Sequence, residues 1–181
     1  MKEILLNQIK EKIKEWDKSD IYAISLWVNN NDDNPCEPTV ILGYNTEKHY
    51  KTQIKNAANR EEARWNFAFW LQNEELIFGI CATKEIVKKW ILENGFKYYT
   101  SDDNMTYEEI EEAEKITQLF VNVLIDIVKE LHATGFIKDQ FGRSVPVLIH
   151  ELEYYEEIAT QNIEANGIEL VKEFNRFCRE E

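Results

Sequence analysis

The sequence predicts one α+β domain spanning residues 1–181, in which several helices pack on a small, mainly antiparallel sheet. One hydrophobic core can serve a chain of 181 residues before division into domains becomes favourable. Apolar residues at helical spacing alternate along the chain with short runs rich in β-branched and aromatic residues. Only 6 Gly and 3 Pro are present, too few for the many tight turns of a β-sandwich.

The N-terminal third predicts a helix followed by a long-looped hairpin. Apolar residues recur at helical spacing over residues 3–17. From Ile21 to Val28 both alternating sets of side chains are mainly apolar, which is typical of a strand covered on both faces. Thr39 to Tyr44 predicts the second strand of the hairpin, and a helix is expected from about Glu47 to Ala58.

Three further interpretations come from the spacing of apolar side chains. Strict alternation places Tyr22 on the same face of the first strand as Ile24. The segment from Ala63 to Leu71 also alternates, and we interpret it as a strand although the flanking Glu and Gln residues suit a helix. Leu76 to Ile80 predicts a further strand or an irregular approach to the next helix.

The longest predicted element is a helix over about residues 106–134. Thr106 and Glu109 have the spacing of a capping box, in which a hydroxyl and a carboxylate each satisfy a free backbone N–H at a helix start. Apolar residues then step by three or four as far as Leu131, and Gly135 closes the helix. The second half is apolar almost all round, so we expect that half to be buried.

Shorter elements complete the predicted fold. A helix over residues 83–94 has Thr83 as its expected N-cap and a glycine directly after it, where left-handed backbone ends helices. Residues 145–150 predict a strand, which Pro146 limits to a sheet edge or a strand start. Two final helices are expected over about residues 151–165 and 168–178.

The charge balance points to a protein partner. The chain has 34 acidic and 21 basic residues, a formal net charge of -13. This composition disfavours nucleic acid and anionic membranes, because both are bound by clustered Lys and Arg. A surface of one sign instead speeds encounter with a basic protein. The acidity can equally serve solubility alone.

Two segments carry most of the excess negative charge and contain no Lys or Arg. They are the candidate surface for a basic partner if they share a face of the molecule. Carboxylates at helix starts also complement the helix dipole, which explains the same pattern without a partner. Residues 101–114 contain Asp102, Asp103, Glu108, Glu109, Glu111, Glu112 and Glu114, and residues 150–164 contain Glu151, Glu153, Glu156, Glu157 and Glu164.

Signatures of catalysis and of cofactor binding are missing. The sequence has no glycine-rich phosphate loop and no nucleophile elbow, and its histidines and cysteines lack metal-ligand spacing. We therefore predict no catalytic residue, cofactor or metal. Cys36, Cys81 and Cys178 are odd in number and unpaired in spacing, which indicates reduced thiols. Without an apolar leader or membrane span, the cytoplasm is the expected location.

A second interpretation is a ligand pocket. Trp65 and Trp70 would line it, and Arg64 beside them is a guanidinium that can lie over an indole face and receive a carboxylate. His150 ends a predicted strand and precedes Glu151, a spacing that suits a general acid/base pair. Core packing of the rings and a hydrogen-bonded histidine at a strand end explain the same residues without any ligand.

Three stretches carry a family resemblance: GYNTE at 43–47, RWNFAFW at 64–70 and VPVLIHEL at 145–152. With them, most of the chain resembles a bacterial family known as domain of unknown function 4303. That family is uncharacterised, so the resemblance implies no catalytic residues. More loosely, the size, acidity and lack of a reaction centre resemble bacterial immunity proteins, which neutralise a partner toxin by binding it.

Three functions follow from the sequence. The first is a non-enzymatic binding protein, such as an immunity protein, whose acidic segments meet a basic partner. The second is an enzyme or small-ligand-binding protein with a pocket near Arg64, Trp65, Trp70 and His150. The third is a homo-oligomeric structural module.

Overall fold

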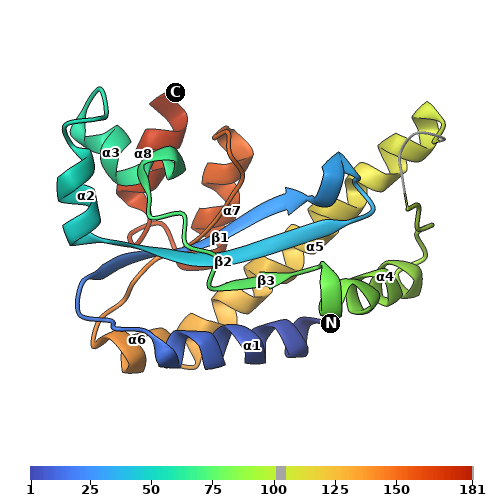
Figure 1. Ribbon diagram of the computed structural model, residues 1–181, viewed down its shortest axis with the longest axis horizontal. Coiled ribbons are helices and arrows are strands. Elements are labelled where there is room, and N and C mark those ends of the chain that lie inside the picture. Colours follow the sequence, from blue (N-terminus) through green and yellow to red (C-terminus); the bar gives the residue numbers. More distant parts are fainter. Residues whose placement is uncertain (101–104, 181) are drawn as a thin grey trace.

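One four-stranded sheet forms the centre of the computed structural model, which describes residues 1–100 and 105–180 (Figure 1). The strand order is β3-β2-β1-β4. β2 pairs antiparallel with β1 and β3, whereas β4 lies parallel to β1 at the edge. The predicted α+β class with a mainly antiparallel sheet is therefore confirmed. The strands are β1 Ile21–Asn30, β2 Pro38–Thr46, β3 Leu76–Phe78 and β4 Val147–His150.

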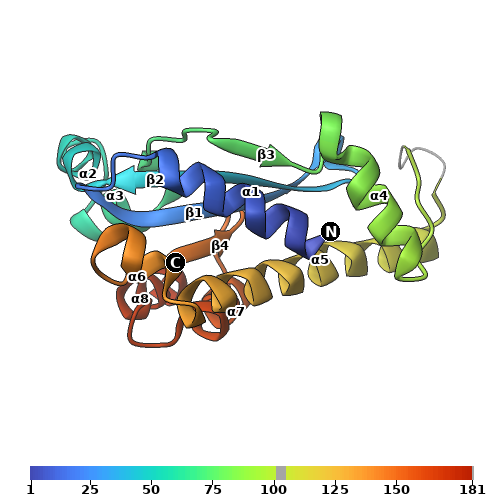
Figure 2. The same ribbon diagram turned by 90° about the horizontal axis from the view of Figure 1, so that it is seen from below.

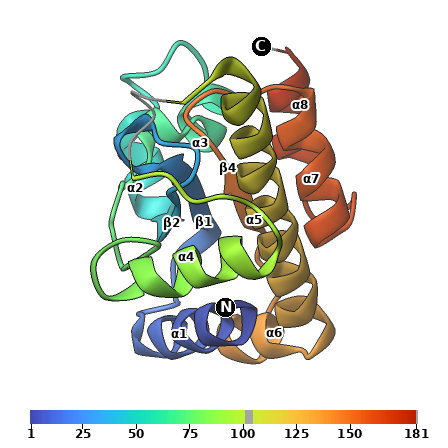
Figure 3. The same cartoon turned by 90° about the vertical axis from the view of Figure 1, so that its right-hand side faces the viewer.

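Helices cover both faces of this sheet. Figures 2 and 3 show α1 and α4 on one side of the strands and α3, α7 and α8 on the other, with the long α5 running past the edge strand β4. Within the described residues there are eight helices: α1 Lys2–Glu15, α2 Glu47–Gln53, α3 Arg60–Trp65, α4 Lys84–Glu93, α5 Tyr107–Ala133, α6 Phe136–Phe141, α7 Glu156–Asn166 and α8 Lys172–Glu180.

Two separate cores result from this layering. The first lies between the sheet and α1, α4 and α5, and it contains mostly aliphatic side chains such as Leu26 and Leu124. The second lies under α3, α7 and α8 and is rich in rings, among them Trp65 and Phe174. β1 contributes to both cores, so the prediction of a strand covered on both faces is confirmed. The buried second half of α5 is confirmed as well.

A β-bulge changes the face on which Tyr22 lies. The register between β1 and β2 shifts between Ile21 and Ala23, so one extra residue is accommodated there. Ile21 packs in the first core, while Tyr22 and Ala23 pack in the second. The predicted face of Tyr22 was therefore wrong. Its hydroxyl now donates a hydrogen bond of 2.6 Å to the carbonyl oxygen of Arg64, beneath the second core.

The predicted strand over residues 63–71 was also wrong. Asn59 caps α3 by accepting from the Glu62 N–H, and Asn66 ends this helix and accepts from the Ala68 N–H of a following 3-10 turn. Ala63, Trp65 and Phe67 are all buried because a short helix and a tight turn face one core in succession. The apparent alternation therefore came from two short helical pieces.

The helix ends follow local chemistry. The capping box of Thr106 and Glu109 is confirmed, with the hydroxyl accepting from the Glu109 N–H and the carboxylate accepting from the Thr106 N–H. Thr83 is not a side-chain N-cap; its hydroxyl accepts from Gly79 N–H and donates to the carbonyl of Ile80. The helices expected over 47–58, 151–165 and 168–178 have shorter ranges, given by α2, α7 and α8.

The late start of α7 leaves an irregular segment, residues 151–155, between β4 and the helix. Tyr154 ties this segment to the chain beyond α3, since its hydroxyl donates to the carbonyl of Trp65 at 3.0 Å and accepts from the N–H of Phe67 at 3.1 Å. The segment lies beside the end of β1, since residues of both line one hollow. This placement forms one wall of the site described next.

Candidate functional site

Two adjoining hollows lie over β1 and β2 on the side of the ring-rich core. The inner hollow has a volume of about 290 Å³, and its lining includes Ser25, Trp27, Gly43, Phe67, Trp70, Glu74 and Leu152. The outer trench has a volume of about 430 Å³, and its lining includes Trp27, Asn30, Asp33, Glu151, Leu152, Glu153 and Tyr155. Trp27 and Leu152 line both hollows, so the hollows adjoin at these two residues, and together they are called the groove below. Lys and Arg are absent from the lining of both.

A small residue explains why the inner hollow exists. Ser25 of β1 lies directly opposite Gly43 of β2, whereas the next pair toward the trench is Trp27 and Ile41. The small side chain of Ser25 leaves space between the surrounding rings, while Asn73 occupies the position over Gly43. The chain at Asn73 crosses this point so closely that a Cβ on Gly43 would lie 2.4 Å from the Asn73 carbonyl oxygen.

A buried serine forms the floor of the inner hollow, and a fully buried histidine lies beneath it. Ser25 Oγ lies 2.8 Å from His150 Nε2, and His150 Nδ1 lies 2.9 Å from the carbonyl oxygen of Glu151. A carbonyl only accepts, so Nδ1 carries the proton and Nε2 accepts from the Ser25 hydroxyl. Burial lowers the pKa of His150 to about 4, so the imidazole is neutral at pH 7. The floor therefore carries no positive charge.

The serine and histidine have the partner geometry of a nucleophile and its base, yet the surroundings do not match acyl transfer. That chemistry needs backbone N–H groups free to hold an oxyanion. Ser25 lies in the middle of the sheet, opposite Gly43 on one side and Leu148 on the other. Its neighbouring backbone is thus engaged in strand pairing. A buried histidine whose hydrogen bonds are satisfied accounts for this arrangement more simply than a reaction centre does.

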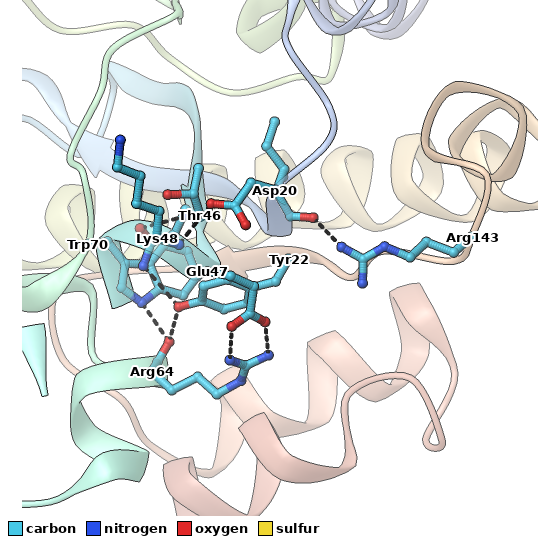
Figure 4. Close-up of polar contacts among 10 residues, drawn as sticks. Asp20, Tyr22, Thr46, Glu47, Lys48, Arg64, Trp70 and Arg143 are labelled. Carbon is cyan, nitrogen blue, oxygen red and sulfur yellow. Dashed lines mark hydrogen bonds and ion pairs between the residues drawn. The ribbon is translucent and has the colours of Figure 1, made fainter. Parts of the chain in front are cut away.

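Arg64 lies elsewhere in the ring-rich core and already has its carboxylate (Figure 4). Its guanidinium pairs with both oxygens of Glu47, at 2.9 and 3.3 Å. The same group lies 4.1 Å from the ring centroid of Tyr22 and 5.2 Å from that of Trp65. The predicted stack of a guanidinium over aromatic faces is therefore present, with a carboxylate of the chain itself in the place of a ligand.

The residues proposed for a ligand pocket do not line one common pocket. Trp70 lines the inner hollow, and His150 is fully buried beneath its floor. Arg64 and Trp65 line a different hollow of about 300 Å³ that also includes Arg143. The two places are linked by Trp70, whose ring lies 5.9 Å from that of His150 and whose Nε1 donates to the Arg64 carbonyl oxygen at 2.9 Å.

Three carboxylates of the two acidic segments are used inside the molecule, and one of them, Glu164, pairs with Lys129 at 2.7 Å. Glu109 serves the capping box and accepts from Tyr99 and Lys97. These hydrogen bonds, with that from Tyr99 the strongest, lower its pKa to about 2. Glu156 forms a two-point ion pair with Arg179. Asp102 and Asp103 lie outside the described residues.

The other predicted carboxylates face solvent without a basic partner. Within residues 1–100 and 105–180, none of them forms an ion pair with Lys or Arg. Glu151 is half-buried, and the rest are exposed. This group, called the open carboxylates below, consists of Glu108, Glu111, Glu112, Glu114, Glu151, Glu153 and Glu157.

The two acidic segments belong to neighbouring helices. α7 packs against the second half of α5, where Lys129 and Glu164 form an ion pair of 2.7 Å and His132 contacts Asn166 at 3.1 Å. The first turns of α5 extend past α7 toward one end of the molecule (Figure 1). The open carboxylates of α5 therefore follow those of the 151–157 segment along the molecule instead of lying next to them.

Neither a metal centre nor a membrane span emerges from the part of the chain that the structure describes. In that part no three His, Cys, Asp or Glu side chains converge as metal ligands, and no helix has the length and apolarity needed to cross a bilayer.

Comparisons with family models, with curated proteins and with solved structures found no significant match. The resemblance to the domain of unknown function 4303 family therefore stays a prediction.

Sequence reasoning missed the residues that shape the groove. Trp27 was interpreted only as part of a strand, Gly43 and Leu152 were linked to no site although they belong to stretches that carry the family resemblance, and Ser25 was not singled out. One signal was available: a serine and a glycine stand near the middle of two strands predicted to pair. Their exact opposition depends on the register, which the sequence alone does not fix.

Proposed function

We propose that this protein is a non-enzymatic binding protein that holds a basic partner protein through its open carboxylates, in the manner of an immunity protein that neutralises a toxin. The partner would meet the 151–157 segment and the first turns of α5. Binding would take place in the cytoplasm, where Cys36, Cys81 and Cys178 remain reduced thiols.

The observation that carries this proposal is that the open carboxylates gather in two segments that contain no Lys or Arg, and that these carboxylates form no ion pair within the described residues. Several exposed acids, including Glu11, Glu15 and Glu164, have a lysine of the chain within 2.9 Å. The open carboxylates have none within the described residues. Unpaired charges of one sign repel each other, so a cationic surface that approaches them gains both attraction and relief of that repulsion.

Exposed apolar side chains accompany the charges of the 151–157 segment. Leu152 is 66% exposed and Tyr155 is 41% exposed, and both line the outer trench. Protein interfaces commonly combine a few large apolar or aromatic anchors with surrounding polar groups. The segment therefore offers a partner apolar area to bury as well as charge to neutralise.

Co-expression with the product of the adjacent gene tests the proposal. We expect the two proteins to co-purify and any toxicity of the neighbour to be relieved. The triple variant E151Q/E153Q/E157Q should weaken the complex at least tenfold, while the matched triple E3Q/E85Q/E169Q, which removes exposed charge elsewhere, should have little effect. Equal weakening by both triples, or a complex insensitive to both, would contradict the proposal.

The buried hydrogen bond between Ser25 and His150 favours a second candidate, an enzyme that uses the serine as a nucleophile. A fluorophosphonate probe, which labels activated serines, separates the two functions. The binding-protein proposal predicts no more labelling of the wild-type chain than of S25A. Stoichiometric labelling that requires both Ser25 and His150 would instead establish the enzyme.

A further inference from the structure

We infer that the inner hollow is a subsite for a cation, and that its occupant is the guanidinium or ammonium group of a side chain of the basic partner. The inference rests on the proposed function and deepens it, because it specifies where a positive side chain enters. Its outer neighbour, the trench, would hold the residues on either side of that cation.

The lining of the inner hollow has the composition of a cation site. The rings of Trp27, Phe67 and Trp70 line it, and an aromatic face attracts a positive charge within about 6 Å of its centroid. Glu74 is exposed at the same hollow and has no ion pair within the described residues. Rings with one carboxylate, and without any Lys or Arg, suit an organic cation better than a neutral or anionic group.

The floor is compatible with the same ligand. The Ser25 hydroxyl donates a hydrogen bond to His150 Nε2, so the lone pairs of its oxygen can still accept a hydrogen bond from an N–H of a guanidinium or ammonium group. The neutral imidazole beneath it does not repel a cation. Because both groups are almost fully buried, an accepted hydrogen bond there would form away from competing water.

The molecule already holds one cation by this chemistry. Arg64 lies over Tyr22 and Trp65 and pairs with Glu47, at the other end of the same ring-rich core. The inner hollow repeats the combination of rings and a carboxylate with no cation of the chain in it. The strands thus provide two comparable environments, one filled by the chain's own arginine and one open.

The outer trench argues that the cation belongs to a protein segment. A free small cation would need only the inner hollow, yet a trench of about 430 Å³ adjoins that hollow at Trp27 and Leu152. All charged residues lining that trench, Asp33, Glu151 and Glu153, are acidic. An extended segment with a buried cation and further basic or apolar neighbours complements both parts of the groove at once.

A peptide titration tests the inference. The probe is the amidated pentapeptide Ala-Arg-Leu-Arg-Ala, with citrulline in place of arginine as a neutral isostere and acetyl-arginine amide as a free small cation. Binding is followed by NMR of the tryptophan indole signals. We expect the arginine peptide to shift the Trp27 signal and to bind more tightly than either the citrulline peptide or acetyl-arginine amide.

Two variants locate the cation. W27L keeps apolar volume but removes an aromatic face, and E74Q removes an exposed charge without disturbing the core. Each should weaken the arginine peptide roughly 2- to 30-fold, which corresponds to the strength of a cation–π contact or a partly buried ion pair. W90L, on the opposite side of the sheet, and E85Q are matched controls that should leave binding unchanged.

The outcomes separate this inference from the proposed function. If E151Q/E153Q weakens the arginine peptide while W27L and E74Q do not, the cation subsite is wrong and the acidic surface stands. Equal affinity for acetyl-arginine amide and the peptide would overturn the assignment to a protein segment. No binding of the arginine peptide would overturn the subsite, and co-purification with the partner would still decide the proposed function independently.

Discussion

His150 illustrates how burial decides the state of a single side chain. The sequence offered two interpretations of His150, a general acid/base paired with a neighbouring carboxylate and a hydrogen-bonded histidine at a strand end; in the structure its ring is fully buried against Phe67 and Trp70. It contacts the carbonyl of Glu151 and not the carboxylate. Desolvation then outweighs the hydrogen bond, and the pKa falls instead of rising.

This burial predicts a pH-dependent stability. The unfolded chain takes up a proton at His150 near pH 6.5, but the folded chain does so only near pH 4. The free energy of unfolding should therefore fall as the pH is lowered from 7 toward 4, by about 3 kcal/mol from this residue. His132, whose pKa burial also lowers, acts in the same direction.

Chemical denaturation of H150Q between pH 7 and pH 5 measures the effect. The variant should be less stable at pH 7, because Ser25 loses its partner, and its stability should change less with pH than that of the wild type. H132Q is the control and should flatten the dependence less. A slope for H150Q as steep as that of the wild type would disprove the buried neutral histidine.

Gly43 gives a second prediction about one residue. An added methyl group would lie 2.4 Å from the backbone oxygen of Asn73, so the crossing loop would have to move. We expect G43A to lower the free energy of unfolding by about 1–3 kcal/mol. G95A is the control: its Cβ meets nothing within 4 Å, and only its positive φ is strained. A smaller loss in G43A than in G95A would show that the loop yields easily.

Elements whose signals are local could be predicted from the sequence. The capping box and the apolar stripe specify α5 without knowledge of the rest of the fold. Pro146 correctly marked β4 as an edge strand beginning directly after it. The prediction of a strand over residues 63–71 was wrong because Asn59 and Asn66 each cap a helical turn. The alternation of buried side chains came from tertiary packing and not from a strand.

The capping box predicts a measurable contribution to stability. T106A should lower the free energy of unfolding by about 1 kcal/mol, because the Glu109 N–H loses its acceptor. Since the pKa of Glu109 lies at about 2, its part of the cap should persist at neutral pH and fade only as the pH falls below 4.5. T160A, an exposed threonine within α7, is the control and should be neutral or slightly stabilising. Equal destabilisation by both would contradict the cap.

For the molecule as a whole, the sequence could predict the class of fold and the excess of negative charge but not the groove. The acidic runs are contiguous in sequence, so they were visible at once. The groove instead joins residues from β1, β2, the loop before β3 and the segment after β4. The strand register and the bulge at Tyr22 bring these residues together, and both depend on pairing between segments that are distant in the sequence.

The net negative charge, and the position of the open carboxylates on the molecule, predict attraction of a basic partner. Electrostatic attraction over such a surface acts mainly on the rate of association, and salt screens it beyond about 10 Å at 0.1 M. Charges at the edge of an interface therefore change the association rate more than the dissociation rate. The partner obtained by co-purification provides the material for a kinetic test.

The most direct test measures the association rate of that complex in stopped flow as ionic strength rises from about 0.02 to 0.5 M. Attraction by the open carboxylates predicts an association rate that falls at least tenfold for the wild type and much less for E151Q/E153Q/E157Q, with E3Q/E85Q/E169Q behaving like the wild type. An association rate that is independent of salt, or equally salt-dependent in both triple variants, would contradict it.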